Sequence, residues 1–138
     1  MKLKIKHILV INQCLLNLDP PSAQKQKAPD ATAKEAKSYD FSAKVAFRMV
    51  TNLGRTQITV DDVEAVRQKT IGKYVAAGET QISPDKVGAF QAEFLPMLEM
   101  EQDIDLLTID VKELDLDKNK VPWSDLAPLI GKVIVGEL

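Results

Sequence analysis

The sequence predicts an α+β fold that is mostly helical, with one long bent central helix, two or three shorter helices and a small two-stranded sheet. Apolar residues recur at helical spacing through most of the segment 34–77, whereas two short segments alternate between polar and apolar residues. No repeat appears at a period of about 20 to 50 residues. We therefore expect residues 1–138 to form a single domain around one core.

The N-terminal part predicts a strand, a helix and a loop. Residues 2–6 read Lys-Leu-Lys-Ile-Lys, which has the two-residue period of a half-buried strand. Residues 8–18 carry apolar side chains at helical spacing, and Pro20 and Pro21 end this pattern because proline disfavours helix at the preceding residue. The following chain is polar and has no period, so we expect a mobile loop over about residues 19–33.

The central segment, from about Lys34 to Ala77, predicts helix, and its middle leaves two alternatives. Either Gly54 ends one helix and Thr59 caps the next, or a single helix bends between these two residues. Gly78 ends the helix in both cases. The predicted inward-facing stripe consists of Tyr39, Ala43, Ala46, Val50, Leu53, Val60, Val63, Val66, Ile71 and Tyr74.

The second half predicts two more helices and a strand. Ser83-Pro84-Asp85 marks a helix start, since a serine oxygen can cap a free amide and proline needs no amide partner in the first turn. Pro96 should weaken the end of that helix. Residues 107–112 alternate as a strand does, and Pro122 opens a short helix. Residues 133–135 continue as helix or as extended chain.

The two predicted strands are complementary in charge. Lys2, Lys4 and Lys6 on the outer face can oppose Asp110 and its neighbouring acids, while the apolar residues of both segments point inward. We therefore expect residues 3–6 to pair with residues 107–112.

Composition and charge exclude several classes of protein. The single cysteine cannot form an intrachain disulfide or a cysteine zinc cluster. No segment approaches the ~20 apolar residues of a membrane span, and Asn12, Gln13 and Asn17 interrupt the apolar run that follows the N-terminal lysines, which argues against a secretory signal. The first third is basic, but its lysines are scattered without interleaved aromatics, which argues against nucleic-acid binding.

Three candidate chemical sites fit structural roles better. Asp115–Asn119 has oxygen ligands at alternate positions, but Lys120 stands where a calcium loop needs glycine and Leu126 where it needs glutamate. We therefore expect a polar turn. His7 has no neighbour in sequence that would orient it as a base, and Cys14 lies on an apolar helix, which is typical of an inert core thiol.

Two further groups resemble sites. Asp61, Asp62 and Glu64 suit a helix N-terminus near Thr59 better than metal or acid–base chemistry. A second set is expected to belong to the core rather than to a cofactor site: Phe90, Phe94, Met97 and Trp123. We therefore predict that the chain is not an enzyme, with no catalytic, cofactor-binding or metal-binding residues.

The order of these segments resembles a family of small, largely uncharacterised proteins that tailed bacteriophages and prophages encode among their virion structural and assembly genes. The resemblance covers about residues 2–8 and 44–131, and it implies a bend near Ile58, where the family has a proline. It is carried by the Lys-rich N-terminus, Lys44–Leu53, Val60–Arg67 (VDDVEAVR), Val87–Phe94 (VGAFQAEF), Leu98–Leu106 (LEMEQDIDL) and Ser124–Ile130 (SDLAPLI).

The resemblance implies a part in building the phage particle. We expect a structural or morphogenesis protein of the tail, neck or head-to-tail region, located in the virion or, during assembly, in the host cytoplasm. It would contact other phage structural proteins, and it could assemble as a homo-oligomer. The alternative is a phage accessory protein outside the virion, either an assembly chaperone or a small regulator of a host protein.

Overall fold

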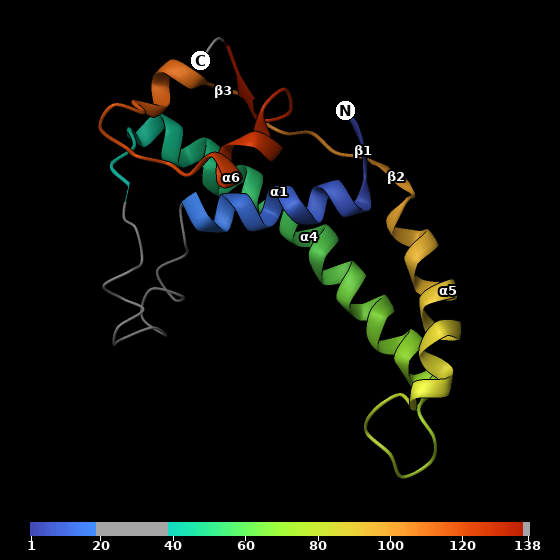
Figure 1. Cartoon of the computed structure of the whole chain (residues 1–138). Coiled ribbons are helices and arrows are strands. Elements are labelled where there is room, and N and C mark those ends of the chain that lie inside the picture. Colours follow the sequence, from blue (N-terminus) through green and yellow to red (C-terminus); the bar gives the residue numbers. More distant parts are fainter. Residues whose placement is uncertain (19–38, 137–138) are drawn as a thin grey trace, which may run out of the picture.

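The computed structural model describes residues 1–18 and 39–136, so the loop predicted over residues 19–33 lies outside the described residues. The fold is α+β and mostly helical, as predicted (Figure 1). The helices are α1 (Ile5–Leu18), α4 (Ala43–Tyr74), α5 (Val87–Leu98) and α6 (Trp123–Leu126). Short strands and 3₁₀ turns complete the described part: β1 (Lys2–Lys4), β2 (Glu101–Asp103), β3 (Ile109–Asp110), β4 (Ile134–Val135), η1 (Pro84–Lys86), η2 (Val111–Leu114) and η3 (Ala127–Leu129).

The N-terminal strand is shorter than predicted, because the chain enters α1 at Ile5 instead of Ile8. The apolar face of α1 is buried as its spacing predicts, with Ile8, Ile11 and Leu15 almost inaccessible to solvent. Leu3 is the side chain of β1 that reaches the same core. β1 therefore contributes a single side chain, Leu3, to the core.

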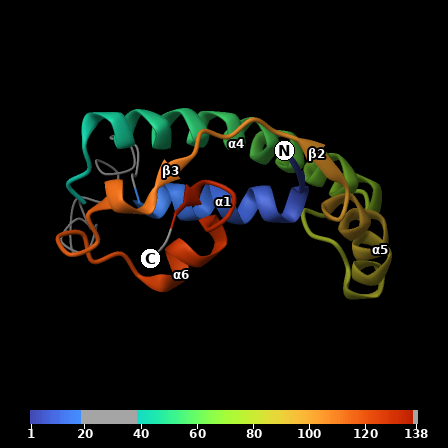
Figure 2. The same ribbon diagram turned by 90° about the horizontal axis from the view of Figure 1, so that it is seen from above.

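Helix α4 is continuous over 32 residues, so the alternative of two helices separated at Gly54 is wrong. The helix begins at Ala43, where the Ser42 hydroxyl accepts a hydrogen bond from the backbone N–H of Val45 (3.3 Å). Its axis changes direction along its length in both views (Figures 1 and 2). The helix ends at Tyr74, where Val75 turns extended, so the predicted end at Gly78 is wrong; Gly78, with a positive φ of 83°, lies in the following turn.

The buried face of α4 is not the predicted stripe. Its buried residues are Val45, Met49, Asn52, Thr56, Thr59 and Thr70. Val50 and Val66, which the prediction placed inward, are exposed. The helix presents a partly polar face to the core, so apolar spacing alone assigned the wrong side.

Polar side chains on this buried face form specific hydrogen bonds. The Asn52 amide donates to the carbonyl of Leu107 (2.8 Å) and accepts from the Leu107 N–H (2.7 Å). Asn12 of α1 donates to the Thr56 hydroxyl (3.1 Å), which itself donates to the Asn52 carbonyl. Thr59, one of the alternative cap residues, instead donates to the side chain of Gln102 in β2 (3.0 Å). These bonds fix α1 and the chain around β2 against α4.

Helix α5 lies beside the C-terminal half of α4, and the two helices form an arm that extends away from α1 and α6 (Figures 1 and 2). The predicted helix start is confirmed as the 3₁₀ turn η1 followed by α5, although Ser83 caps no amide. Phe90 stacks on Phe94 with ring centroids 5.4 Å apart and meets Tyr74 edge-on at 6.4 Å. Contacts between these half-buried rings therefore hold α5 against the end of α4.

The predicted pairing of residues 3–6 with residues 107–112 is wrong. β1 pairs antiparallel with β2, with Leu3 opposite Gln102, while β3 pairs in parallel with β4. The charge complementarity expected of the N-terminal strand is nonetheless present, because Lys4 and Lys6 both bind Glu99, at 3.0 and 2.6 Å. The acids that attract these lysines lie just before and within β2 rather than near Asp110.

The C-terminal segment completes the core on the other side of α1. Residues 134–135 are extended as strand β4 and Val133 lies in the turn before it, and Val133 and Ile134 are buried together with Ile109 and Leu129. The predicted core set of Phe90, Phe94, Met97 and Trp123 is wrong, because the first three are only half-buried and lie outside the core cluster, and Trp123 is 59% exposed. The core is therefore aliphatic, and it lies between α1, the first half of α4 and the C-terminal elements (Figure 2).

Candidate functional site

Cys14 and His7 lie on α1, away from one another. The Cys14 thiol is buried and faces the carbonyl oxygen of Ser124 (3.9 Å). Burial raises the pKa of this thiol, and the nearby carboxylate of Asp125 raises it further. A thiol that resists ionisation is a poor nucleophile, so the prediction of a core cysteine is confirmed. His7 is half-buried.

Asp115–Asn119 forms the predicted polar turn. Asp115 adopts a left-handed conformation with φ 50°. The buried Asn119 side chain donates to the carbonyls of Leu114 (2.8 Å) and Asp40 (3.2 Å) and accepts from the Asp40 N–H (2.9 Å). Lys118 pairs with the Asp40 carboxylate and holds its pKa below the ordinary value. Asn119 and Lys118 therefore hold Asp40, and with it the chain that precedes α4, against this turn.

The acidic run on α4 lies in the middle of the helix instead of at a helix N-terminus. Asp61 and Asp62 are exposed, and Gln57 donates to Asp61 (3.0 Å). Arg67 binds both oxygens of Glu64, at 2.8 and 2.9 Å, and this contact lowers the pKa of Glu64 to about 2. Among the residues that the structure describes, no three His, Cys, Asp or Glu side chains gather as metal ligands.

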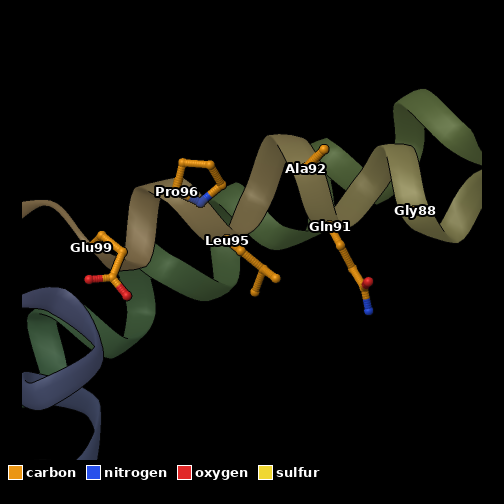
Figure 3. A pocket seen from close by; sticks show the side chains of 6 residues that line it. All are labelled: Gly88, Gln91, Ala92, Leu95, Pro96 and Glu99. Carbon is orange, nitrogen blue, oxygen red and sulfur yellow. The ribbon is translucent and has the colours of Figure 1, made fainter.

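An exposed groove runs along the outer side of α5. It is lined by Gly88, Gln91, Ala92, Leu95, Pro96 and Glu99, which lie three or four residues apart and so share one side of the helix. Leu95 and Gln91 project on one side of this groove and Ala92 and Pro96 on the other (Figure 3). Leu95 is 51% exposed, and no residue of α5 is fully buried. We call this surface the α5 groove.

One end of the α5 groove is charged. Glu99 receives hydrogen bonds from both Lys4 and Lys6, which lower its pKa to about 2. Two ammonium groups share the Glu99 carboxylate, and Glu101 lies opposite Lys4 in the β1–β2 pair, so this end of the groove carries charges of both signs. All three side chains remain partly exposed to solvent.

The composition of α5 is the feature of the sequence that could have predicted this groove. The residues Val87–Leu98 are apolar around most of the helix, and such a helix is normally enclosed by protein. Here Phe90 and Phe94 face α4 while Leu95 and Pro96 lie on the open side. Among the described residues, α5 therefore leaves apolar side chains exposed on the side away from α4.

No protein-family model, curated protein or solved structure matches this chain. Within the described ranges, no helix is both long and apolar enough to cross a lipid bilayer. The exposed apolar side chains of the arm are thus the feature from which a role can be inferred.

Proposed function

We propose that this protein is a structural or assembly component of a tailed bacteriophage, in the tail, neck or head-to-tail region, and that it acts by binding other proteins of the particle and further copies of itself. The observation that carries a binding role is the α5 groove, an apolar surface that the described part of the chain leaves exposed. The resemblance to phage proteins supports the setting. The proposal assigns no catalytic activity to the chain.

The groove suits one side of a helix from another particle protein. Gly88 and Ala92 have small or no side chains, so a partner backbone can approach closely, and Leu95 and Pro96 offer apolar contact. The lysines around Glu99 favour a partner with an acidic residue at that end of its helix. Burying Leu95 and its neighbours would supply the main hydrophobic contribution to binding.

Mass spectrometry of purified particles tests this role. We expect the chain to remain at a fixed stoichiometry through density-gradient purification and a high-salt wash. A phage carrying Leu95→Asp should lose the chain from its particles, because a charge on the groove cannot be desolvated cheaply. Thr108→Asp, an exposed change outside the arm, should leave incorporation unchanged.

The same experiment distinguishes the alternative role outside the virion. If particles form normally and contain none of the wild-type chain, the protein is no structural component. If particle yield falls when the chain is deleted although mature particles lack it, it is an assembly chaperone. Normal particles without the chain, together with a host protein captured by wild type but not by Leu95→Asp, would identify a regulator.

A further inference from the structure

We propose that a second copy of this chain binds the outward face of α4, so that two α4 helices pack antiparallel about a two-fold axis. This surface is separate from the α5 groove, and the proposal does not depend on the proposed function. It uses a stripe of residues on the first half of α4, defined here as the outward stripe: Phe47, Val50, Thr51, Gly54 and Ile58.

The outward stripe is apolar and open to solvent. Phe47, Val50 and Ile58 are exposed by 67%, 59% and 62%. At about 100° per residue they lie opposite the buried residues Val45 and Met49. α1 and α6 lie on the other side of α4, which forms one edge of the molecule (Figure 2).

The inward face of this part of α4 buries polar side chains beside Val45 and Met49. The inward face carries Asn52, Thr56 and Thr59, whereas the outward face carries Phe47 and Ile58. A helix that exposes its large apolar residues while burying its amide and hydroxyl groups has a second packing surface. One chain occupies only the first of them.

The spacing of the outward face is self-complementary. Four of its five members, all but Val50, alternate steps of three and four residues together with the charged residues that flank them: Lys44, Phe47, Thr51, Gly54, Ile58 and Asp61. This series reads with the same steps in both directions and is the spacing of an antiparallel coiled-coil seam. A two-fold axis requires such a surface, since each residue then meets its counterpart in reverse order.

The symmetric register pairs side chains that fit. Phe47 lies against the partner's Ile58, and Thr51 lies over the partner's Gly54. A Cβ added at Gly54 would meet nothing within 4 Å, so this position is open to an approaching side chain. Gly54 thus offers a hole in which the partner's Thr51 can sit.

The flanking charges favour the antiparallel orientation. In the same register Lys44 meets the partner's Asp61, whereas a parallel pair would place Lys44 against Lys44. Within one chain these two residues are about 26 Å apart along the helix and cannot pair. Lys44 also lies 3.5 Å from Glu113, but Arg48 binds that carboxylate at 3.2 Å, so Lys44 can turn away without leaving it unpaired. Gln57 bonds one oxygen of Asp61, which leaves the other available.

Analytical ultracentrifugation of the full chain tests the interface. We expect a dimer in the wild type. Ile58→Asp should raise the dimer dissociation constant about a hundredfold or more, because the change enters the interface twice. Val66→Asp, an exposed valine on the same helix outside the outward stripe, is the matched control and should leave the dissociation constant within about twofold. Circular dichroism should show unchanged helix content in both variants.

A charge-reversal mixture tests the register. Lys44→Glu alone creates two acid–acid contacts per dimer, and Asp61→Lys alone creates two lysine–lysine contacts, so each variant should dissociate about tenfold more readily. An equimolar mixture of the two variants should recover the dimer, since the mixed pair restores both contacts with opposite charges. No change within a single chain can produce this recovery.

Several outcomes would overturn the proposal. A wild-type chain that stays monomeric at a protein concentration of about 1 mM would exclude the α4–α4 dimer. A dimer insensitive to Ile58→Asp uses another surface. Unfolding of Ile58→Asp would mean that the same chain covers the stripe. Failure of the mixture to recover, with cross-linking between two copies of Lys44→Cys, would show a parallel pair.

Discussion

The side chain of Asn52 provides both hydrogen bonds that the backbone of Leu107 would otherwise obtain from a neighbouring strand. Asn52→Ala would leave that N–H and carbonyl without protein partners in a partly buried site. We expect a loss of about 2–4 kcal/mol in the free energy of unfolding, measured by urea denaturation.

Asn17→Ala is the comparison for Asn52→Ala. Asn17 is an exposed asparagine whose amide donates to Asp125 (2.9 Å). Its replacement should change the free energy of unfolding by less than about 1 kcal/mol, because water can replace the lost bond. Equal losses in the two variants would contradict the structural role of Asn52.

Glu99 makes stability depend on pH. Its pKa falls from 4.5 to about 2 in the folded chain, because Lys6 and Lys4 hydrogen-bond its carboxylate. A lowered folded pKa gives stability that is complete above the unfolded pKa and is lost as pH falls toward the folded value. Wild type should therefore be more stable than Glu99→Gln at pH 6, and the gap should narrow steadily below about pH 4.5.

Urea denaturation from pH 6 to pH 3 measures this gap. Glu79→Gln, an exposed change in the turn after α4, is the control for removing a carboxylate elsewhere in the chain. A Glu99→Gln curve parallel to that of wild type would show that the two lysines do not hold the carboxylate.

Gly54 lies inside α4 and Gly78 lies in the turn after it, and replacing each glycine by alanine should change stability in opposite directions. Gly54 lies inside the helix with open space around it, so Gly54→Ala should stabilise the fold by about 0.5–1 kcal/mol through helix propensity. Gly78 has a positive φ, so Gly78→Ala should destabilise it by about 1 kcal/mol. Thermal denaturation of both variants checks the pair, and a loss in Gly54→Ala would argue against a continuous helix.

The two residues of strand β3 have different roles: one is buried in the core and the other caps η2. Ile109 is completely buried, so Ile109→Asp should cost about 3–5 kcal/mol. The Asp110 carboxylate accepts a hydrogen bond from the Lys112 N–H (2.9 Å) at the start of η2, and asparagine can do the same. Asp110→Asn should therefore cost less than about 1 kcal/mol. Urea denaturation compares the two, and equal losses would be contrary to this assignment.

The molecule divides into a well-packed body and a thinly packed arm. Between Val60 and Leu98 only Thr70 is buried, whereas α1 buries most of one face. Local opening needs less free energy where fewer apolar contacts break. Amide hydrogen exchange should therefore be at least about tenfold faster in α5 than in the middle of α1. Equal protection in the free chain would show that the arm is stabilised by contacts other than these.

Local patterns in the sequence determined the helical elements. The spacing of Ile8, Ile11 and Leu15 identified the inner face of α1, and Ser83-Pro84-Asp85 marked the entry to α5. The alternation at the N-terminus identified a strand and its basic outer face. The same patterns also identified Cys14 as a core residue and Asp115–Asn119 as a turn. Each of these features depends on neighbours within about one helical turn or one strand.

Only the tertiary structure decided which strands pair, which side of α4 faces inward and which apolar residues stay exposed. β2, with the sequence Glu-Gln-Asp, has no apolar alternation, and it pairs with β1 because the chain returning from α5 passes there. The inward side of α4 carries Asn52 and Thr56 because their partners, Leu107 and Asn12, come from distant segments. A polar residue can lie in the core when a segment distant in the sequence supplies its hydrogen-bond partner. The local spacing of apolar residues cannot predict such a partner.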